Sequence, residues 1–314
     1  MHDGEEASTS RWPAIETLLA RGRRRRLPGA GLPGAIEWLS DGSLLIDKGW
    51  PAAPVGRLGE GLAPSAGWWL RADPVHLLPF GDRLQLLPAG NLEGPASDAL
   101  VGAFNAHFEA DGYRLEAPHA ERWYLRAPRP LRIDTCAPGE AAVRDVYDCM
   151  PTGADAALAA RLMTEAQMIF HAAGGSAGDP PVNGLWLWGG GELPQRRAAP
   201  LPPLWSDEPF VRGVWLLTGN SVRALPGTAA ECLALQEADG FAAFGTFDVA
   251  RRNEATSTLE SSWCAPLVAA LGRGQVAELD LLPGGAERFE LTRAGARRFW
   301  RRRRPLTGER SPDA

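Results

Sequence analysis

The chain has few histidines and no long apolar stretch. Its 314 residues include only five histidines, and none of them follows His171. The four cysteines form no Cys-x-x-Cys pair. No apolar run reaches the roughly 18 residues that a transmembrane helix requires. These absences argue against a histidine-rich metal centre, a disulfide framework and a membrane-spanning protein.

An excess of positive charge is also missing. The net charge is −5 and the isoelectric point is near 5.7, which does not suit a general nucleic-acid binder. The first ten residues, MHDGEEASTS, are acidic and polar, unlike a signal peptide. Together with the scattered cysteines, this start predicts a cytoplasmic protein with reduced thiols. The length allows one large domain or two modest ones.

Positive charge is concentrated in two arginine runs near the ends of the chain. Arg21 and Arg23–Arg26 form the first, and Arg297, Arg298 and Arg301–Arg304 form the second. Such runs can contact nucleic acid or an acidic partner. The commoner alternative is solvated charge in a tail and at a helix end. The sequence leaves both interpretations open.

Apolar spacing predicts several elements in the first two thirds of the chain. Leu100, Phe104 and Phe108 recur every fourth residue, which marks one face of a helix. Similar reasoning gives further helices near residues 14–21 and 158–169. It gives strands near residues 68–71, 82–87, 113–116 and 122–126, the last two forming a hairpin.

The last third of the chain alternates between the two kinds of pattern. Strand-like segments cover residues 211–218, 241–249 and 276–282, and helix-like segments cover residues 229–238 and 254–271. The first of these helices begins at a capping box, Thr228 with Glu231. Alternating strands and helices indicate βαβ units and therefore a mainly parallel sheet.

One segment, PPVNGLWLWGGGELP (Pro180–Pro194), combines rigid and pliable backbone. In a strand, Trp186 and Trp188 would share one face and the two leucines the other. Apolar residues on both faces favour a strand covered on both sides, as in a parallel sheet. Gly189–Gly191 then permit positive φ or a close approach of backbone. The segment is either a core strand with a tight turn or the lining of a ligand site.

Three stretches together resemble a known family. They are Trp69-Leu70-Arg71-Ala72-Asp73, the helix–strand–strand order of residues 98–125, and LMTEAQMIFHAAGG followed by the Pro-x-Asn-x-x-Trp-x-Trp-Gly-x-Gly-x-x-Pro pattern. In these features the chain resembles archaeal-type cofactor-independent phosphoglycerate mutases, which belong to the alkaline phosphatase superfamily. It is more closely similar to the bacterial RpfE-type regulatory protein family. The resemblance covers residues 68–227, with weaker similarity beyond.

The resemblance implies an α/β fold. It would have an alkaline-phosphatase-like, mostly parallel sheet core and a smaller inserted α/β lobe. The boundaries expected on this basis are a basic, loosely ordered tail at 1–34, core segments at 35–90 and 181–304, an inserted lobe at 91–180, and a C-terminal tail at 305–314.

The resemblance also implies a ligand site, because the Trp-Gly segment of the mutases borders the substrate cleft. The candidate ligand-binding residues are Arg71, Arg122, Asn183, Trp188, Gly189, Gly190 and Gly191. The two arginines could grip a carboxylate or a phosphate with paired hydrogen bonds. Each could instead form an ion pair within the protein, which is the commoner fate of an arginine.

The departures from the family concern its chemistry. The mutases use two divalent metals and a serine or threonine nucleophile, with ligands in an Asp-rich strand end and in C-terminal Asp and His motifs. Here residues 1–67 contain no such strand end, and residues 183–314 contain no histidine. Asp248 and Asp280 end predicted strands without imidazole partners. Glu192 replaces a basic residue and would repel a phosphate. We therefore expect no catalytic residues, no metal and no cofactor.

Three functions remain open at this point. The first is a non-catalytic, regulatory protein that binds a phosphorylated or carboxylate small molecule or a protein partner, without nucleic acid or membrane. The second is a metal-dependent phosphoglycerate mutase or phosphatase with displaced ligands. The third is an adaptor that binds nucleic acid or an acidic partner through the arginine runs.

Overall fold

A computed structural model of the chain describes residues 11–44, 50–173, 178–235, 242–244 and 252–303. The chain forms two compact units. Unit 1 comprises Met1–Asp47, Ala199–Asp207 and Asn220–Ala314, and unit 2 comprises Lys48–Ala198 and Glu208–Gly219. Among the described residues, no helix has both the length and the apolar character needed to cross a membrane.

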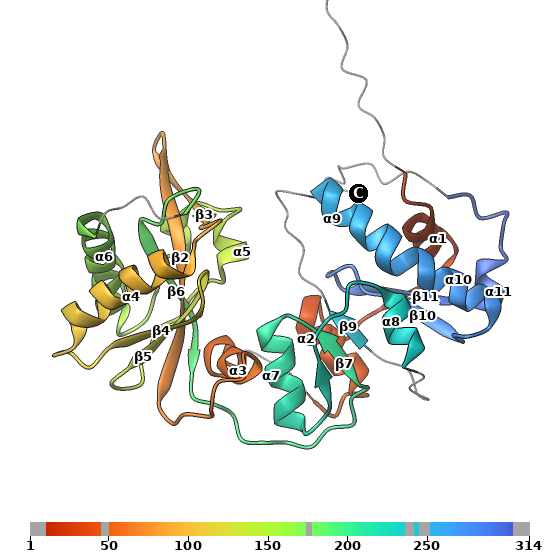
Figure 1. The fold of residues 1–314 in the computed structure, drawn as a ribbon, viewed down its shortest axis with the longest axis horizontal. Helices are drawn as coiled ribbons and strands as arrows, with labels where there is room; N and C mark the ends of the chain where they lie inside the picture. Colours follow the sequence, from red (N-terminus) through yellow and green to blue (C-terminus); the bar gives the residue numbers. More distant parts are fainter. Residues whose placement is uncertain (1–10, 45–49, 174–177, 236–241, 245–251, 304–314) are drawn as a thin grey trace, which may run out of the picture. The chain divides into compact units, whose positions relative to one another are not determined.

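Unit 2 is built on an antiparallel sheet of five strands (Figure 1). Its strands are β2 (Trp68–Phe80), β3 (Arg83–Pro88), β4 (Arg114–His119), β5 (Arg122–Ala127) and β6 (Gly184–Gly191). The order is β3-β2-β5-β4, and β6 pairs with the other edge of β2. The long strand β2 therefore organises the sheet, because it pairs with three others.

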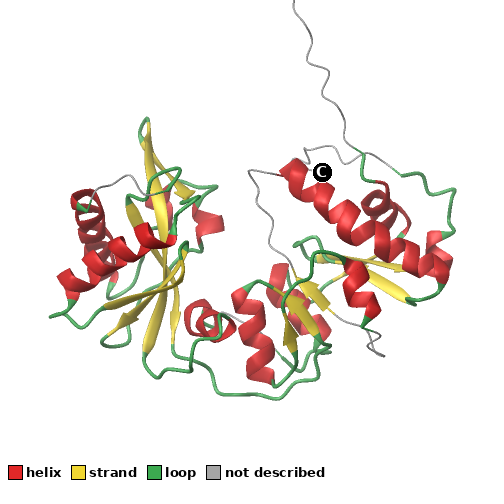
Figure 2. Cartoon of the chain, viewed as in Figure 1, coloured by secondary structure: helices red, strands yellow, loops and turns green. Residues whose placement is uncertain are grey.

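Helices cover both faces of this sheet (Figure 2). The long helices α4 (Gly94–Phe108) and α6 (Ala156–Ala172) pack against one face, where Phe104, Trp123 and Phe170 are fully buried. Helix α3 (Ala52–Gly59) packs against β2 and β6 on the opposite face, where Ala53, Trp69 and Tyr124 form a small buried cluster. Two short elements, α5 (Pro138–Ala141) and η1 (Val146–Cys149), also belong to the unit.

Helix α7 (Pro209–Thr218) packs closely against α3 because glycines remove the side chains between them. A Cβ atom at Gly213 would lie 1.9 Å from the carbonyl oxygen of Val55, and one at Gly59 would lie 1.8 Å from that of Pro209. The Nε of Arg212 also donates to the Gly59 carbonyl at 2.9 Å. The two glycines therefore fix α7 to unit 2.

Unit 1 contains two small sheets. An antiparallel sheet has the order β1-β11-β10, and a parallel sheet has the order β8-β7-β9. Their strands are β1 (Arg23–Arg26), β7 (Leu204–Ser206), β8 (Val222–Arg223), β9 (Ala242–Phe244), β10 (Glu278–Leu281) and β11 (Glu287–Thr292). The helices are α1 (Pro13–Arg21), α2 (Gly31–Leu39), α8 (Ala229–Ala234), α9 (Arg252–Thr258), the π-helix η2 (Leu259–Cys264), α10 (Ala265–Arg273) and α11 (Arg293–Ala296).

The mixed α/β character is confirmed, but the mostly parallel core is wrong. Within the described residues, parallel pairing is confined to β7, β8 and β9. Strand β6 instead pairs antiparallel with β2. Both faces of β6 are apolar because helices cover the antiparallel sheet on both sides. A strand of a parallel sheet that is covered on both sides has the same residue pattern, so the sequence did not distinguish the two.

Two local predictions also differ from the structure. Residues 211–218, expected as a strand, lie in α7, because Pro209 starts a helix and the Glu208 carboxylate accepts the Val211 N–H at 2.7 Å. In the expected basic tail, 1–34, the helix expected near residues 14–21 is present as α1, but the segment is packed and not loose: Ile15 and Leu18 are buried in the core of unit 1, and β1 pairs with β11. Asp248 and most of the expected strand 241–249 lie outside the described residues.

The two units also divide the chain differently from the expected segments. Residues 50–90, 91–173 and 178–198 contribute to one unit, although the expected boundaries separate an inserted lobe at 91–180 from the core. Strand β2, from before residue 90, pairs with β6, from after residue 181, and with β5 of the expected lobe, so all three lie in one sheet. Long antiparallel pairing therefore joins the expected segments.

Candidate functional site

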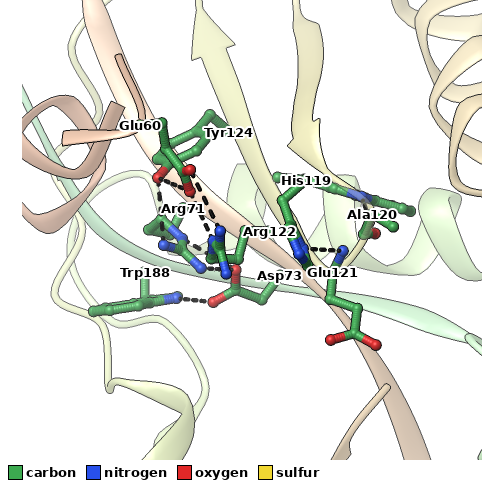
Figure 3. A network of polar contacts seen from close by, with 10 residues as sticks. Glu60, Arg71, Asp73, His119, Ala120, Glu121, Arg122, Tyr124 and Trp188 are labelled. Atoms are coloured by element: carbon green, nitrogen blue, oxygen red, sulfur yellow. Dashed lines mark hydrogen bonds and ion pairs between the residues drawn. The ribbon is translucent and has the colours of Figure 1, made fainter. Parts of the chain in front are cut away.

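A row of three polar or aromatic residues crosses the middle of the unit 2 sheet. Arg71 on β2 is paired in register with Trp188 on β6 and with Tyr124 on β5. Because strand side chains alternate, Asp73 and Arg122 lie two residues further along on the same face. This is the face that α3 covers. Figure 3 shows these side chains converging on one another.

Asp73 holds Arg71 and Trp188 together. The Nε of Arg71 donates to Asp73 Oδ1 at 3.0 Å, with a second, shorter contact from Nη2 to the same oxygen. The indole Nε1 of Trp188 donates to the other carboxylate oxygen at 2.6 Å. Burial raises the pKa of Asp73, although Arg71 and Trp188 oppose this effect. Burial also opposes the charge on Arg71, but Asp73 and Tyr124 outweigh it and raise the pKa of Arg71.

Arg122 is held by a second carboxylate, Glu60, which follows α3. The Nε of Arg122 donates to Glu60 Oε1 at 2.7 Å, and Nη2 donates to Oε2 at 3.4 Å. The Tyr124 hydroxyl lies 3.5 Å from both Glu60 Oε1 and Arg71 Nη1, so it connects the two pairs. Burial raises the pKa of Tyr124, which keeps its hydroxyl protonated. Arg122 is the most open member of the two pairs, with 32% of its side chain exposed.

Glu208 adds a third carboxylate near both arginines. It precedes α7, and its carboxylate accepts backbone hydrogen bonds from the first turn. Burial raises the pKa of Glu208, although the N–H groups of Val211 and Phe210 and the charges of Arg71 and Arg122 oppose the change. The two guanidinium groups therefore contact two carboxylates directly, and Glu208 interacts with both of them electrostatically. We call Glu60, Arg71, Asp73, Arg122, Tyr124, Trp188 and Glu208 the arginine network.

The three glycines after Trp188 allow neighbouring parts of the same chain to pack closely against the backbone. Gly189 has φ = +61°, and a Cβ there would lie 2.7 Å from the Cβ of Ala52. A Cβ at Gly191 would lie 2.5 Å from Pro51, and one at Gly190 would lie 2.8 Å from Leu70. The close approach expected from the sequence is therefore made by the start of α3. The Gly189 N–H donates to Thr135 Oγ1 at 3.3 Å.

Asn183 lies apart from the arginine network. Its side chain extends the strand pairing, since Oδ1 accepts the Leu77 N–H at 2.7 Å and Nδ2 donates to the Leu77 carbonyl at 3.0 Å. Leu77 is six residues from Arg71 along β2, roughly 20 Å at the usual rise of a strand. The structure therefore brings together Arg71, Arg122 and Trp188, and it leaves Asn183 outside this group.

The described residues do not match the two hard divalent metals that the resemblance implies. Three of their four histidines are engaged separately: His76 with the Pro181 carbonyl, His107 with Glu165, and His119 with the Glu121 N–H. Asp280 forms an ion pair with Arg288. Within the described ranges, the one group of three possible ligands contains two thiols, Cys136 and Cys149, with Glu140. Thiols suit softer metals, so this donor set does not fit a magnesium- or manganese-type pair.

An open groove lies at the edge of the α3-covered face. Its volume is about 670 Å³, and it is lined by Arg57, Arg114, Glu116, the loop Leu62–Ser65, and Ala117–Pro118. The Nε of Arg57 donates to Glu116 Oε2 at 3.2 Å, and Glu116 is paired in register with Tyr124 on the neighbouring strand. The groove is therefore next to the arginine network, and it contains none of the residues predicted from the sequence.

Sequence reasoning missed Asp73, Tyr124, Glu60 and Glu208 as members of the network. A signal existed for the first two. Arg71-x-Asp73 and Arg122-x-Tyr124 are pairs two residues apart within strands, which places each pair on one face. Glu60 and Glu208 flank helices, and nothing in the sequence links them to the arginines.

Comparisons with known proteins give only distant similarity. No protein-family model matches the chain, and no curated protein matches it. Its structure is similar to that of the cofactor-independent phosphoglycerate mutase from Thermoplasma acidophilum, at 15% identity and a TM-score of 0.40, over 90% of this chain and 82% of the other. It is also similar to the PH0037 protein from Pyrococcus horikoshii, at 14% identity and a TM-score of 0.40, over 75% of this chain and 63% of the other. At these scores neither similarity assigns an activity.

Proposed function

We propose that the chain is a divergent, RpfE-type relative of the phosphoglycerate mutases, that it is not a catalyst, and that it binds a ligand or partner in the cytoplasm for a regulatory purpose. The observation that carries this proposal is the pairing of Arg71 and Arg122 with the protein's own carboxylates. The two arginines expected to grip an anion are already occupied.

The electrostatics explain why this pairing argues against catalysis. Phosphoryl transfer requires concentrated positive charge around the transferring oxygens. In the arginine network, Glu60 and Asp73 contact the two guanidinium groups directly, and Glu208 adds negative charge nearby. A phosphate would therefore meet a site without excess positive charge. Stabilisation of a phosphoryl transition state would require removing at least one of these carboxylates.

A small carboxylate or phosphate ligand would enter at Arg122. This side chain is 32% exposed, against 11% for Arg71. A ligand that replaced Glu60 would exchange one bidentate anion for another. Such exchange permits binding and leaves the more deeply buried Arg71–Asp73 pair intact.

A thermal-shift experiment tests this ligand class. The probes are 3-phosphoglycerate, 2-phosphoglycerate and inorganic phosphate, against the wild type, Arg122→Ala, and Arg83→Ala as a matched control on an exposed position of β3. A ligand that binds only the folded state adds about 2.7 kcal/mol of stability at 100 times its Kd. We expect a concentration-dependent shift in the wild type and the control, and none in Arg122→Ala. Equal shifts in all three proteins, or none with any probe, would contradict the proposal.

One observation favours the adaptor function as a second candidate. The two arginine runs lie together in unit 1, because Arg21 Nη1 donates to the Ala296 carbonyl at 2.6 Å. Phe299 and Trp300, within the second run, are 78% and 66% exposed. Exposed aromatic rings among arginines suit single-stranded nucleic acid, whose bases stack on such rings. Arg24 and Arg25, however, are paired with Glu287 and Glu290.

Retention on immobilised single-stranded DNA separates the two candidates. The adaptor function predicts binding that weakens steeply with salt and that drops on Trp300→Ala. The leading proposal predicts no retention at physiological ionic strength. Salt-sensitive retention that requires Trp300 would therefore favour the adaptor.

A further inference from the structure

Unit 2 carries a cluster of metal-binding side chains away from the arginine network. The thiols of Cys136 and Cys149 and a carboxylate oxygen of Glu140 all lie within 4.8 Å of one another. The three residues come from a short stretch that contains α5 and η1. The resemblance aligns a Pro-His-Asp segment of the mutases near Ala137–Glu140, where this chain has no histidine, and it assigns no role to either cysteine.

The backbone around this cluster is fixed from several sides. The Trp186 indole donates to the Cys136 carbonyl at 2.9 Å, which ties the first cysteine to the sheet. Asp145 caps η1, because its side chain accepts the Tyr147 N–H at 3.1 Å. The same carboxylate accepts the Leu84 N–H of β3 at 3.4 Å, which ties η1 to the sheet as well. The arrangement of the two thiols is therefore held by the fold.

The cluster is closed on one side and open on the other. Cys149 is fully buried, Cys136 is half-buried and Glu140 is exposed. A metal ion could reach the thiols from solvent, and water could complete its coordination. Zinc bound by cysteines is tetrahedral with Zn–S distances of about 2.3 Å, which separates neighbouring ligand atoms by about 3.8 Å. The observed separations therefore need only small side-chain movements.

We propose that Cys136, Cys149 and Glu140 bind a single thiophilic divalent cation of the zinc class, with water in the fourth position. Two thiolates select soft or borderline metals over magnesium and calcium. The inference does not depend on the function proposed for the arginine network, because no residue is shared between them.

Two features oppose binding and set its selectivity. Burial and the neighbouring Cys149 raise the pKa of Cys136 to about 11, so the metal must displace thiol protons. Arg144 donates to Glu140 at 2.8 Å and competes for that carboxylate. Only a cation with high affinity for sulfur overcomes both effects. Removal of the Arg144 guanidinium should accordingly tighten binding.

Cobalt titration of the reduced protein under anaerobic conditions provides the test. We expect one equivalent of Co²⁺ to produce thiolate-to-cobalt charge-transfer absorption and the intense visible bands of tetrahedral cobalt. Cys136→Ser and Cys149→Ser should each abolish the charge-transfer signal. Cys232→Ser, which changes a buried cysteine of unit 1, should leave it unchanged.

A surface variant keeps the test valid if the cysteine variants fold poorly. Glu140 is exposed, so Glu140→Gln should fold normally and weaken cobalt binding about tenfold, while Arg144→Ala should strengthen it. Wild type without charge-transfer bands would overturn the proposal. Bands that persist in Cys136→Ser would overturn it as well.

Discussion

The two faces of the unit 2 sheet are stabilised by different physics. On the face covered by α4 and α6, apolar side chains pack against one another. The rings of Trp123 and Phe170 pack edge to face with centroids 5.9 Å apart, and Phe104 is fully buried. On the face covered by α3, charged groups are buried in pairs, as with Arg71 and Asp73. Apolar burial is favourable in itself, whereas a buried ion pair roughly balances its attraction against the loss of water.

This difference shows which face is free to carry function. The apolar face contributes most of the stability and offers no chemistry. The charged face contributes little net stability while both partners are present, but it becomes costly when one partner is lost. Our hypothesis is that this protein keeps the charged face for specificity or for binding. The predictions below test this contrast, from the largest expected effect to the smallest.

The apolar face should give the largest loss of stability on truncation. Phe104→Ala should lower the free energy of unfolding by about 3–5 kcal/mol, because it removes a buried ring and leaves a cavity. Urea denaturation followed by circular dichroism measures the change. Phe80→Ala is the control, since Phe80 is 71% exposed and its loss should be nearly neutral. Equal effects at the two positions would contradict the assigned core.

The charged face should respond strongly to the loss of one partner. Asp73→Ala should cost about 3 kcal/mol, because it leaves the Arg71 guanidinium buried without its carboxylate. The double variant Arg71→Met with Asp73→Leu should recover most of that loss, since both charges are removed together. A double-mutant cycle by urea denaturation measures the coupling. Strictly additive losses would show that the two side chains do not form the pair described above.

The junction of α3 with α7 should be sensitive to a single methyl group. Gly213→Ala should cost about 1–3 kcal/mol, because the new Cβ would overlap the Val55 carbonyl. Gly102→Ala is the matched control, as a Cβ there has no neighbour within 4 Å. In the middle of α4 it should stabilise the protein by up to about 1 kcal/mol through helix propensity. Thermal denaturation should show a lower melting temperature for Gly213→Ala and an unchanged or higher one for Gly102→Ala.

The smallest effect concerns the pH dependence of Glu208. Burial raises the pKa of Glu208 in the folded protein, so the folded state binds the proton more tightly than the unfolded state. This contribution to stability is present at acidic pH and is lost as pH rises from the unfolded pKa through the folded one. Glu208→Gln should therefore gain stability relative to the wild type over that interval. A wild type that becomes relatively more stable with rising pH would reverse the assigned direction.

Local patterns predicted the elements of unit 2 better than their pairing. The spacing of Leu100, Phe104 and Phe108 indicated α4, and Trp68–Arg71 indicated the start of β2, since burial on one face leaves a periodic trace. The same logic failed for α7, where Val211, Val214 and Trp215 have high strand propensity. There Pro209 and the Glu208 cap decided the outcome, and the buried residues do follow helical spacing.

The candidate site was predictable only in part, because it depends on contacts distant in sequence. Arg71, Arg122 and Trp188 were identified by resemblance, and they do lie together. Their neutralisation by Glu60, Asp73 and Glu208 required the antiparallel pairing of β2 with β5 and β6 and the packing of α3. Whether an arginine is free to bind an anion depends on such partners, which its own sequence neighbourhood does not specify.

The central claim is that the arginine network is neutralised from within and that the protein does not catalyse phosphoryl transfer. Interconversion of 2- and 3-phosphoglycerate by the purified full chain, assayed with manganese, magnesium, cobalt and zinc in turn, tests this claim most directly. We predict no turnover above the rate without protein under any of these conditions. Turnover that requires added metal and disappears on chelation would contradict the claim and establish a metal-dependent mutase.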